Sequence, residues 1–156
     1  DALWARTLEL NLVVPFVLTR LVVKDMLEAG HGRIVHLAST ASLKGYAYTS
    51  AYSASKHGLL GLARAQSLEW APRGVTVNCV CPGFVDTELT ASAARAIAQK
   101  TGRSVPEVQS ELAKENPLGR LIRPEEVAEA VAGFLGPHGD AVTGQALVVA
   151  GGAVQA

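Results

Sequence analysis

The stretch "RIVHLAS", residues 33–39, is short, rich in β-branched residues and almost entirely apolar up to its final serine. Such a run is typical of a strand covered on both faces, as strands are in a parallel sheet flanked by helices. Parallel strands need a crossover connection, which is usually a helix. The stretch therefore predicts an α/β fold with helices on either side of it in the sequence.

The segments around this strand fit that prediction. Residues 2–29 carry apolar residues at helical spacing and end at a glycine pair, so we expect one long helix there. After a loop, a second helix is expected at about 51–70. Buried strands are expected at 75–83 and 145–152, with a helix at 123–136 between them. This α-β-α-β-α-β order indicates a doubly wound parallel sheet with helices on both faces.

The segment between Thr87 and Arg123 is different, because it holds two short helical stretches instead of a direct connection. Ser104 and Glu107 form the signature of a capping box at the start of one of them. An excursion of this length between a strand and the next regular helix is usually functional. We expect a helical lid inserted at about 88–118, with a helical hairpin of no special function as the alternative.

Composition limits the classes of function. The chain has 156 residues, of which 49% are apolar, and its formal net charge is zero. One domain with a real core is expected, and disorder, nucleic-acid binding and binding to an anionic membrane surface are disfavoured. No apolar run has the length of a membrane span.

The cysteines and histidines indicate no metal site. Cys79 and Cys81 fall on one face of a predicted strand, and although a C-x-C pair can bind metal, no second cluster completes a site. They are predicted to be buried small hydrophobes in a reducing, cytoplasmic setting. The histidines are scattered, and no metal-ligand set is expected among His31, His36, His57 and His138.

The sequence "YSASK", residues 52–56, places Tyr52 and Lys56 one helical turn, about 5–6 Å, apart. A nearby ammonium lowers the pKa of a phenol from about 10, so Tyr52 could transfer a proton near pH 7. Ser39 ends the first predicted strand, and its hydroxyl could hold a substrate oxygen on which charge develops. Because ligands bind at the carboxyl ends of parallel strands, these groups suit interconversion of an alcohol and a carbonyl with a hydride carrier. The alternative is a surface tyrosine beside a solvated lysine.

Asn11 is a further candidate because of Pro15. In a regular helix the N–H of residue 15 would bond to the carbonyl of residue 11, and proline has no N–H. We therefore expect a kink and a free Asn11 carbonyl, where a bound water could continue a proton path from Lys56. A kinked helix with a solvated asparagine is the alternative.

The order and spacing of Ser39, Tyr52, Lys56 and the following "NCVCPGFVDT" (78–87) resemble those of the short-chain dehydrogenase/reductases. The resemblance covers essentially the whole chain, including Asn11 and the last predicted strand. It implies a Rossmann-like fold and a catalytic tetrad of Asn11, Ser39, Tyr52 and Lys56. In this tetrad Tyr52 would donate or accept the proton, Lys56 would also hold the nicotinamide ribose, and Ser39 would orient the substrate.

The resemblance also implies an NAD or NADP cofactor. Its nicotinamide end would be contacted by Pro82, Gly83, Val85 and Thr87. The family's opening strand, glycine-rich turn and helix, which hold the pyrophosphate, have no counterpart in this sequence. We therefore expect residues 1–156 to be the carboxyl-terminal part of a single short-chain dehydrogenase/reductase domain, without its mononucleotide-binding part.

Within the family, the chain looks most like reductases of 3-oxoacyl thioesters, 3-hydroxybutyrate dehydrogenases and aromatic-polyketide ketoreductases. This implies a small substrate with a 3-keto or 3-hydroxy group. Tyr46 and Tyr48 would form part of the wall of its binding site, and the alternative is that they pack in the core. A homodimer or homotetramer is implied, through the helices that carry Asn11 and Tyr52 and through the last strand. Two alternatives are a non-catalytic, oligomer-forming protein of the same fold and a sugar epimerase or dehydratase, which shares the YxxxK motif.

Overall fold

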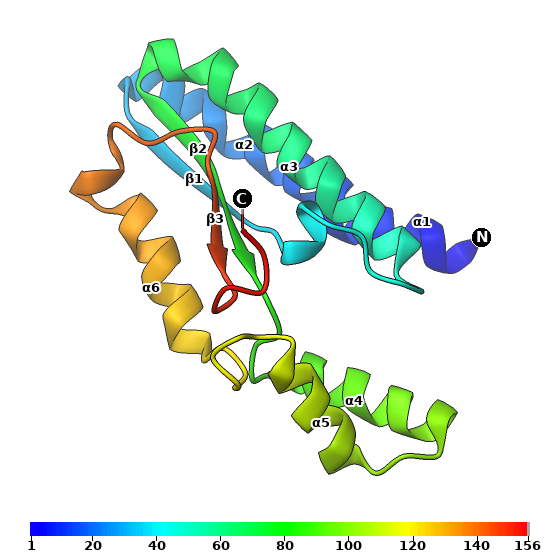
Figure 1. Cartoon of the computed structure of the whole chain (residues 1–156). Helices are drawn as coiled ribbons and strands as arrows, with labels where there is room; N and C mark the ends of the chain where they lie inside the picture. Colours follow the sequence, from blue (N-terminus) through cyan, green and yellow to red (C-terminus); the bar gives the residue numbers. More distant parts are fainter. Residues whose placement is uncertain (156) are drawn as a thin grey trace.

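The fold is built on a parallel sheet of three strands. The computed structural model describes residues 1–155, and of His138 only the main chain, so the expectation about its side chain lies outside the described part. The strands are β1 (Gly32–Leu37), β2 (Val75–Pro82) and β3 (Ala146–Val149), in the order β1-β2-β3. Figure 1 shows α2 and α3 on one face of the sheet and α6 on the other. The predicted doubly wound parallel architecture is confirmed.

The helices follow the predicted order along the chain. Before β1 come α1 (Ala2–Leu8), a π-helical turn (Glu9–Val13) and α2 (Val14–Ala29). A 3-10 turn (Thr40–Ser42) and α3 (Ser50–Trp70) connect β1 to β2. The connection from β2 to β3 contains α4 (Glu88–Thr101), α5 (Val105–Lys114) and α6 (Pro124–Leu135). Across residues 1–155, no helix has both the length and the apolar character needed to cross a bilayer.

The element boundaries differ from the predicted ones most clearly at the first and last strands. The strand predicted at 33–39 ends at Leu37, because Ser39 already acts as the N-cap of the 3-10 turn. The strand predicted at 145–152 ends at Val149, and Gly151 and Gly152 follow it with φ of 56° and 92°. Glycine adopts such angles readily, so the chain can turn at this point.

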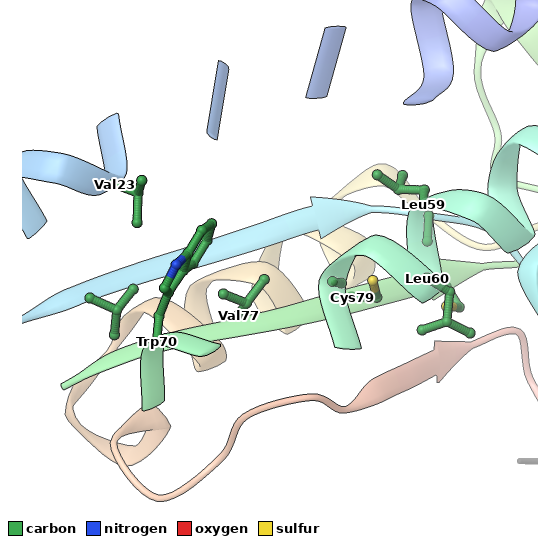
Figure 2. Packing of buried hydrophobic residues seen from close by; sticks show 10 residues of the cluster. Val23, Leu59, Leu60, Trp70, Val77 and Cys79 are labelled. Atoms are coloured by element: carbon green, nitrogen blue, oxygen red, sulfur yellow. The ribbon is translucent and has the colours of Figure 1, made fainter. Parts of the chain in front are cut away.

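Two apolar clusters cover the two faces of the sheet. The larger one lies under α2 and α3 and includes Leu59, Trp70, Val77 and Cys79 (Figure 2). The other lies under α6 and includes Val80 and Phe134. Every position of β2 is buried, as expected of a central strand covered on both faces.

Both cysteines are free, fully buried and part of the cluster under α3. The prediction that they share one face of a strand and serve as small buried hydrophobes is therefore confirmed. Burial raises the pKa of Cys79 to about 12, so this thiol stays protonated near neutral pH.

The segment between β2 and α6 forms a helical hairpin with an apolar cluster of its own. Ala94 and Ala98 of α4 pack with Val108 of α5. The predicted capping box is present, since Ser104 and Glu107 exchange side-chain and main-chain hydrogen bonds. Figure 1 shows α4 and α5 beyond the carboxyl ends of the strands, apart from the helices that cover the sheet.

Candidate active site

Ser39 lies where β1 gives way to the next turn. The pairing of the two strands continues to Ala38, whose N–H donates to the Val80 carbonyl at 2.8 Å. Ser39 then has an extended backbone (φ −167°, ψ 162°), and its Oγ accepts a hydrogen bond of 3.1 Å from the Ala41 N–H. The hydroxyl is thereby fixed at the carboxyl end of the sheet, and within residues 1–155 its own proton is free to be donated.

Tyr52 and Lys56 lie in the first two turns of α3, and Lys56 reaches back to the end of β1. Its ammonium Nζ donates a hydrogen bond of 2.9 Å to the carbonyl of Leu37, two residues before Ser39. The same Nζ lies 5.7 Å from the centroid of the Tyr52 ring. One cation therefore connects the phenol with the strand end that carries Ser39.

The environment of Lys56 weakens its charged form. Burial lowers the pKa of the ammonium below its ordinary value. Tyr52 is half-buried, and within residues 1–155 its hydroxyl has no hydrogen-bond partner. A free phenol close to a partly desolvated ammonium is the arrangement that proton transfer by tyrosine requires.

Asn11 is tied to the helix that carries this pair. Its Nδ2 donates a hydrogen bond of 3.1 Å to Ser55 Oγ, and Ser55 Oγ donates at 2.7 Å to the carbonyl of Tyr52. Ser55 is fully buried. Sequence reasoning named Asn11 for its carbonyl, whereas these hydrogen bonds engage its side-chain amide.

The main chain around Asn11 is irregular, as Pro15 predicts, but the irregularity is a π-helical turn. The Val14 N–H donates to the carbonyl of Glu9, five residues earlier, in place of the usual partner four residues earlier. A π-bulge is a local change of helix geometry that often occurs at functional sites. The water expected at the Asn11 carbonyl stays a prediction.

The stretch "PGFVDT" crosses the same edge of the sheet. Pro82 is the last residue of β2, and the Gly83 N–H donates to the Val149 carbonyl at 3.1 Å. A Cβ atom at Gly83 would lie 3.0 Å from the Cβ of Ala150, so a larger residue would crowd β3. Val85 pairs with Ile122 in a parallel bridge, and Thr87 is the N-cap residue of α4. The four residues expected at the nicotinamide thus lie in one continuous segment, from the last residue of β2 to the N-cap of α4.

Of the two candidate wall residues, Tyr46 is fixed and Tyr48 is not. The Tyr46 hydroxyl is 2.7 Å from Thr40 Oγ1, and its ring meets Phe84 edge-on, with centroids 6.5 Å apart. Lys44 Nζ lies 4.7 Å from the centroid of the same ring. Tyr48 is fully exposed and has a positive φ of 64°, so it does not pack in the core.

Several residues of the site could not be predicted from sequence patterns. Ser55 stands inside "YSASK", but its two hydrogen bonds depend on a residue 44 positions away. Leu37 takes part through its main-chain carbonyl, and the identity of its side chain does not predict this role. Phe84 lies inside "PGFVDT" and faces the loop that carries Tyr46.

A doubly wound parallel sheet with Ser39 at the end of one strand, and Tyr52 and Lys56 on the helix that follows, is the arrangement of a short-chain dehydrogenase/reductase. Within this class, residues 1–154 match the family model described as enoyl-(acyl carrier protein) reductase. The chain belongs to this family.

Individual relatives agree with this assignment. A protein of Streptomyces coelicolor named as a ketoacyl reductase is 46% identical over 154 residues, which are 97% of this chain and 59% of that protein. The D-beta-hydroxybutyrate dehydrogenase of Cupriavidus necator is 41% identical over 133 residues, 85% of this chain and 51% of the relative. The crystal structure of an actinorhodin polyketide ketoreductase with NADPH superposes with a TM-score of 0.93 at 44% identity, covering 98% of this chain and 59% of that one. The chain thus spans somewhat more than half the length of these proteins.

Proposed function

We propose that this chain is the catalytic, carboxyl-terminal part of an NAD(P)-dependent oxidoreductase that interconverts a 3-keto group and the corresponding 3-hydroxy group. The observation that carries the proposal is the position of the Lys56 ammonium, 2.9 Å from the Leu37 carbonyl and 5.7 Å from the centroid of the Tyr52 ring. It links an otherwise free phenol to the strand end that carries Ser39. The names of the relatives, a ketoacyl reductase and a hydroxybutyrate dehydrogenase, support the same chemistry.

Each member of the proposed tetrad has a distinct task. Tyr52 gives its phenolic proton to the carbonyl oxygen on reduction and takes it back on oxidation. The Lys56 ammonium stabilises the phenolate that is left. Ser39 donates a hydrogen bond to the substrate oxygen on which negative charge develops. Asn11 acts from the π-helical turn between α1 and α2. Its side chain donates a hydrogen bond to Ser55, and its carbonyl binds the water that returns a proton to Lys56.

The residues around the site fit a nicotinamide cofactor. Such a cofactor supplies or accepts the hydride. The Lys56 ammonium has three N–H donors and gives one to the Leu37 carbonyl, so it can also donate to ribose hydroxyls while that hydrogen bond is kept. The nicotinamide end would be contacted by Pro82, Gly83, Val85 and Thr87, which lie between the carboxyl end of β2 and the start of α4.

The substrate side is formed by the loop after Ser39 and by the α4–α5 hairpin. Tyr46 can serve as a fixed wall, because Thr40 holds its hydroxyl and Phe84 its ring edge. The hairpin begins at Thr87 and can close over the site as a lid, covering residues 88–118. This arrangement suits a small carbonyl compound with an apolar or aromatic body.

A homodimer or homotetramer is part of the proposal. Large apolar side chains stay exposed on two of the helices, with Leu3 of α1 73% and Leu68 of α3 81% exposed. Patches of this kind mark surfaces that become covered by protein. Sedimentation velocity of the complete protein would show the assembly, and a monomer at micromolar concentration would contradict it.

The test is a screen of the complete protein, in which this chain is joined to its dinucleotide-binding part. NADH and NADPH are each offered with 3-ketoacyl thioesters, with cyclic ketones and, in the oxidised form, with 3-hydroxybutyrate. We expect turnover with at least one 3-keto or 3-hydroxy compound and its loss in Tyr52→Phe. A complete protein that binds the cofactors without oxidising or reducing any of these compounds would contradict the proposal.

A further inference from the structure

A polar pair lies inside the apolar layer between the sheet and α3. His36 of β1 and Gln66 of α3 are 7% and 4% exposed, and His36 Nε2 is 3.4 Å from Gln66 Oε1. His36 lies opposite Cys79 in the register of β1 and β2, within the layer that also holds Leu59 and Ala63. Polar groups buried in such surroundings are costly unless they bond to one another. The pair therefore holds β1 and α3 in one relative position.

The same two elements are joined a second time, at the active site. His36 immediately precedes Leu37, whose carbonyl accepts the hydrogen bond from Lys56 Nζ at 2.9 Å. Gln66 and Lys56 belong to the same helix. The end of β1 is thus bound to α3 by Lys56, which reaches from the helix to the strand, and by His36, which reaches from the strand to the helix.

The protonation of His36 fits this arrangement. The amide oxygen of Gln66 can only accept, so the proton lies on Nε2 and the neutral ring donates. Burial lowers the pKa of His36; the Gln66 hydrogen bond opposes this shift, and the positive charge of Lys56 adds to it. A neutral imidazole leaves Lys56 as the cation of this part of the site.

We propose that His36 and Gln66 are positioning residues of the active site, which fix the Leu37 carbonyl and through it direct the Lys56 ammonium toward Tyr52 and the cofactor ribose. The inference rests on the function proposed above. It assigns a role to two buried residues that are outside the tetrad and that contact neither the substrate nor the cofactor. Loss of either one frees the end of β1 to shift against α3.

The experiment uses the complete protein with His36→Leu, Gln66→Met and the double variant. The expected result is a rise in the KM for the cofactor and a fall in kcat, together roughly tenfold in kcat/KM, for each single variant. The double variant should be no worse than the singles, because either change already breaks the pair. His36→Gln, which keeps a donor for Gln66 Oε1, should recover most of the loss. Ser67→Ala is the matched control, since it removes a different buried hydrogen bond of α3, from Ser67 Oγ to the Arg64 carbonyl at 2.7 Å.

A second readout is independent of turnover. Competitive labelling with acetic anhydride, followed by mass spectrometry, reports the reactivity of the Lys56 amine in the cofactor-free protein. We expect Lys56 to be labelled several-fold faster in Gln66→Met, which keeps the volume of the side chain, and at the parental rate in Ser67→Ala. Parental labelling of Lys56 together with parental kcat and KM in a folded Gln66→Met would overturn the inference, even if its melting temperature were lower. Absence of ketoreductase activity in the parent would instead count against the proposed function, while the labelling result still decides whether the pair positions Lys56.

Discussion

Asn11 and Ser55 are 44 positions apart in the sequence and are joined by a hydrogen bond of 3.1 Å from Asn11 Nδ2 to Ser55 Oγ. Ser55 passes the connection on, because its hydroxyl donates at 2.7 Å to the carbonyl of Tyr52. The π-helical turn that carries Asn11 and the helix α3 that carries Tyr52 and Lys56 are therefore coupled beside the candidate site. Ser55 is the residue through which the two helices are held.

Replacing Ser55 with alanine should destabilise the protein, because the Asn11 amide, which is partly exposed, loses its hydrogen bond to fully buried Ser55. A hydrogen bond typically contributes about 0.5–1.5 kcal/mol of net stability. We expect the free energy of unfolding in urea to fall by about that amount. Ser110→Ala, on the exposed face of α5, is the control and should leave it unchanged. A Ser55→Ala protein as stable as its parent would show that the bond does not hold the helices together.

Replacing Tyr52 with phenylalanine in the complete protein should remove nearly all turnover and leave cofactor affinity close to the parental value. Only the phenolic hydroxyl is deleted, and within residues 1–155 it bonds to no other group. General acid–base catalysis typically contributes about 10²–10⁴-fold. Steady-state rates and a fluorescence titration with the cofactor measure the two effects separately. Activity within about tenfold of the parent would argue against Tyr52 as the proton donor.

Replacing Lys56 with methionine should have two effects, because the ammonium both approaches the Tyr52 ring and can bind the ribose. Cofactor affinity should fall, and kcat should fall as well, since the phenolate left when Tyr52 gives up its proton loses its neighbouring cation. Steady-state rates and a cofactor titration test these effects. Lys44→Met is the control, as Lys44 contacts Tyr46 and not Tyr52. A parental kcat with native affinity would exclude both roles.

Much of this structure could be predicted from local patterns, for identifiable reasons. Continuous apolar runs predicted β1 and β2, because a strand that helices cover on both faces needs apolar side chains at successive positions. Ser104 with Glu107 predicted the start of α5, since a capping box is a local hydrogen-bond pattern. The spacing of Tyr52 and Lys56 predicted their proximity in the same way.

Contacts between distant segments could not be predicted. The hydrogen bonds from Asn11 to Ser55 and from Lys56 to the Leu37 carbonyl depend on how α1–α2 and β1 lie against α3. Pro15 indicated a missing main-chain hydrogen bond. A kink and a π-turn can both accommodate that missing bond, and only the surrounding packing decides between them.

The first turn of α6, which follows the α4–α5 hairpin, should be sensitive to acid through Glu126. Its carboxylate accepts hydrogen bonds of 2.8 and 2.7 Å from Arg120 and one of 2.8 Å from the Arg123 N–H, which lower its pKa to about 2. The unfolded chain has a value of about 4.3. Because the folded value is lower, the contribution of Glu126 to stability is complete above about pH 4.3 and is lost as the pH falls toward 2.

Glu126→Gln should therefore flatten the dependence of the unfolding free energy on pH in this interval. Urea unfolding at several pH values between about 5 and 2.5 measures it. Glu125→Gln is the matched control, since Glu125 is exposed and forms no salt bridge within residues 1–155, so its slope should equal that of the parent. Equal slopes for all three proteins would show that the Arg120 pair adds nothing.

The 156-residue chain on its own should bind a dinucleotide only weakly, although it carries every residue of the proposed tetrad. A doubly wound dinucleotide site uses two βαβαβ halves, and a glycine-rich turn presents helix N–H groups to the pyrophosphate. No glycine-rich turn of that kind follows a strand in this sequence, so under the proposed function Lys56 and the segment after Pro82 would contact only the nicotinamide and its ribose. Loss of several charge-assisted hydrogen bonds, each worth about 1.5–3 kcal/mol, would weaken a micromolar site by orders of magnitude.

The sheet leads to a second expectation for the isolated chain, which is that it associates. Within the described residues β1 pairs only with β2, so its other edge is open and can pair with a second chain. Titration of the isolated chain with NADH and with NADPH, followed by fluorescence, tests the affinity, and light scattering follows association. The complete protein serves as the positive control and its Lys56→Met variant as the negative one. Saturable micromolar binding by the isolated chain would contradict the view that the phosphate-binding half is needed, and with it the proposal that this chain is one part of a larger reductase.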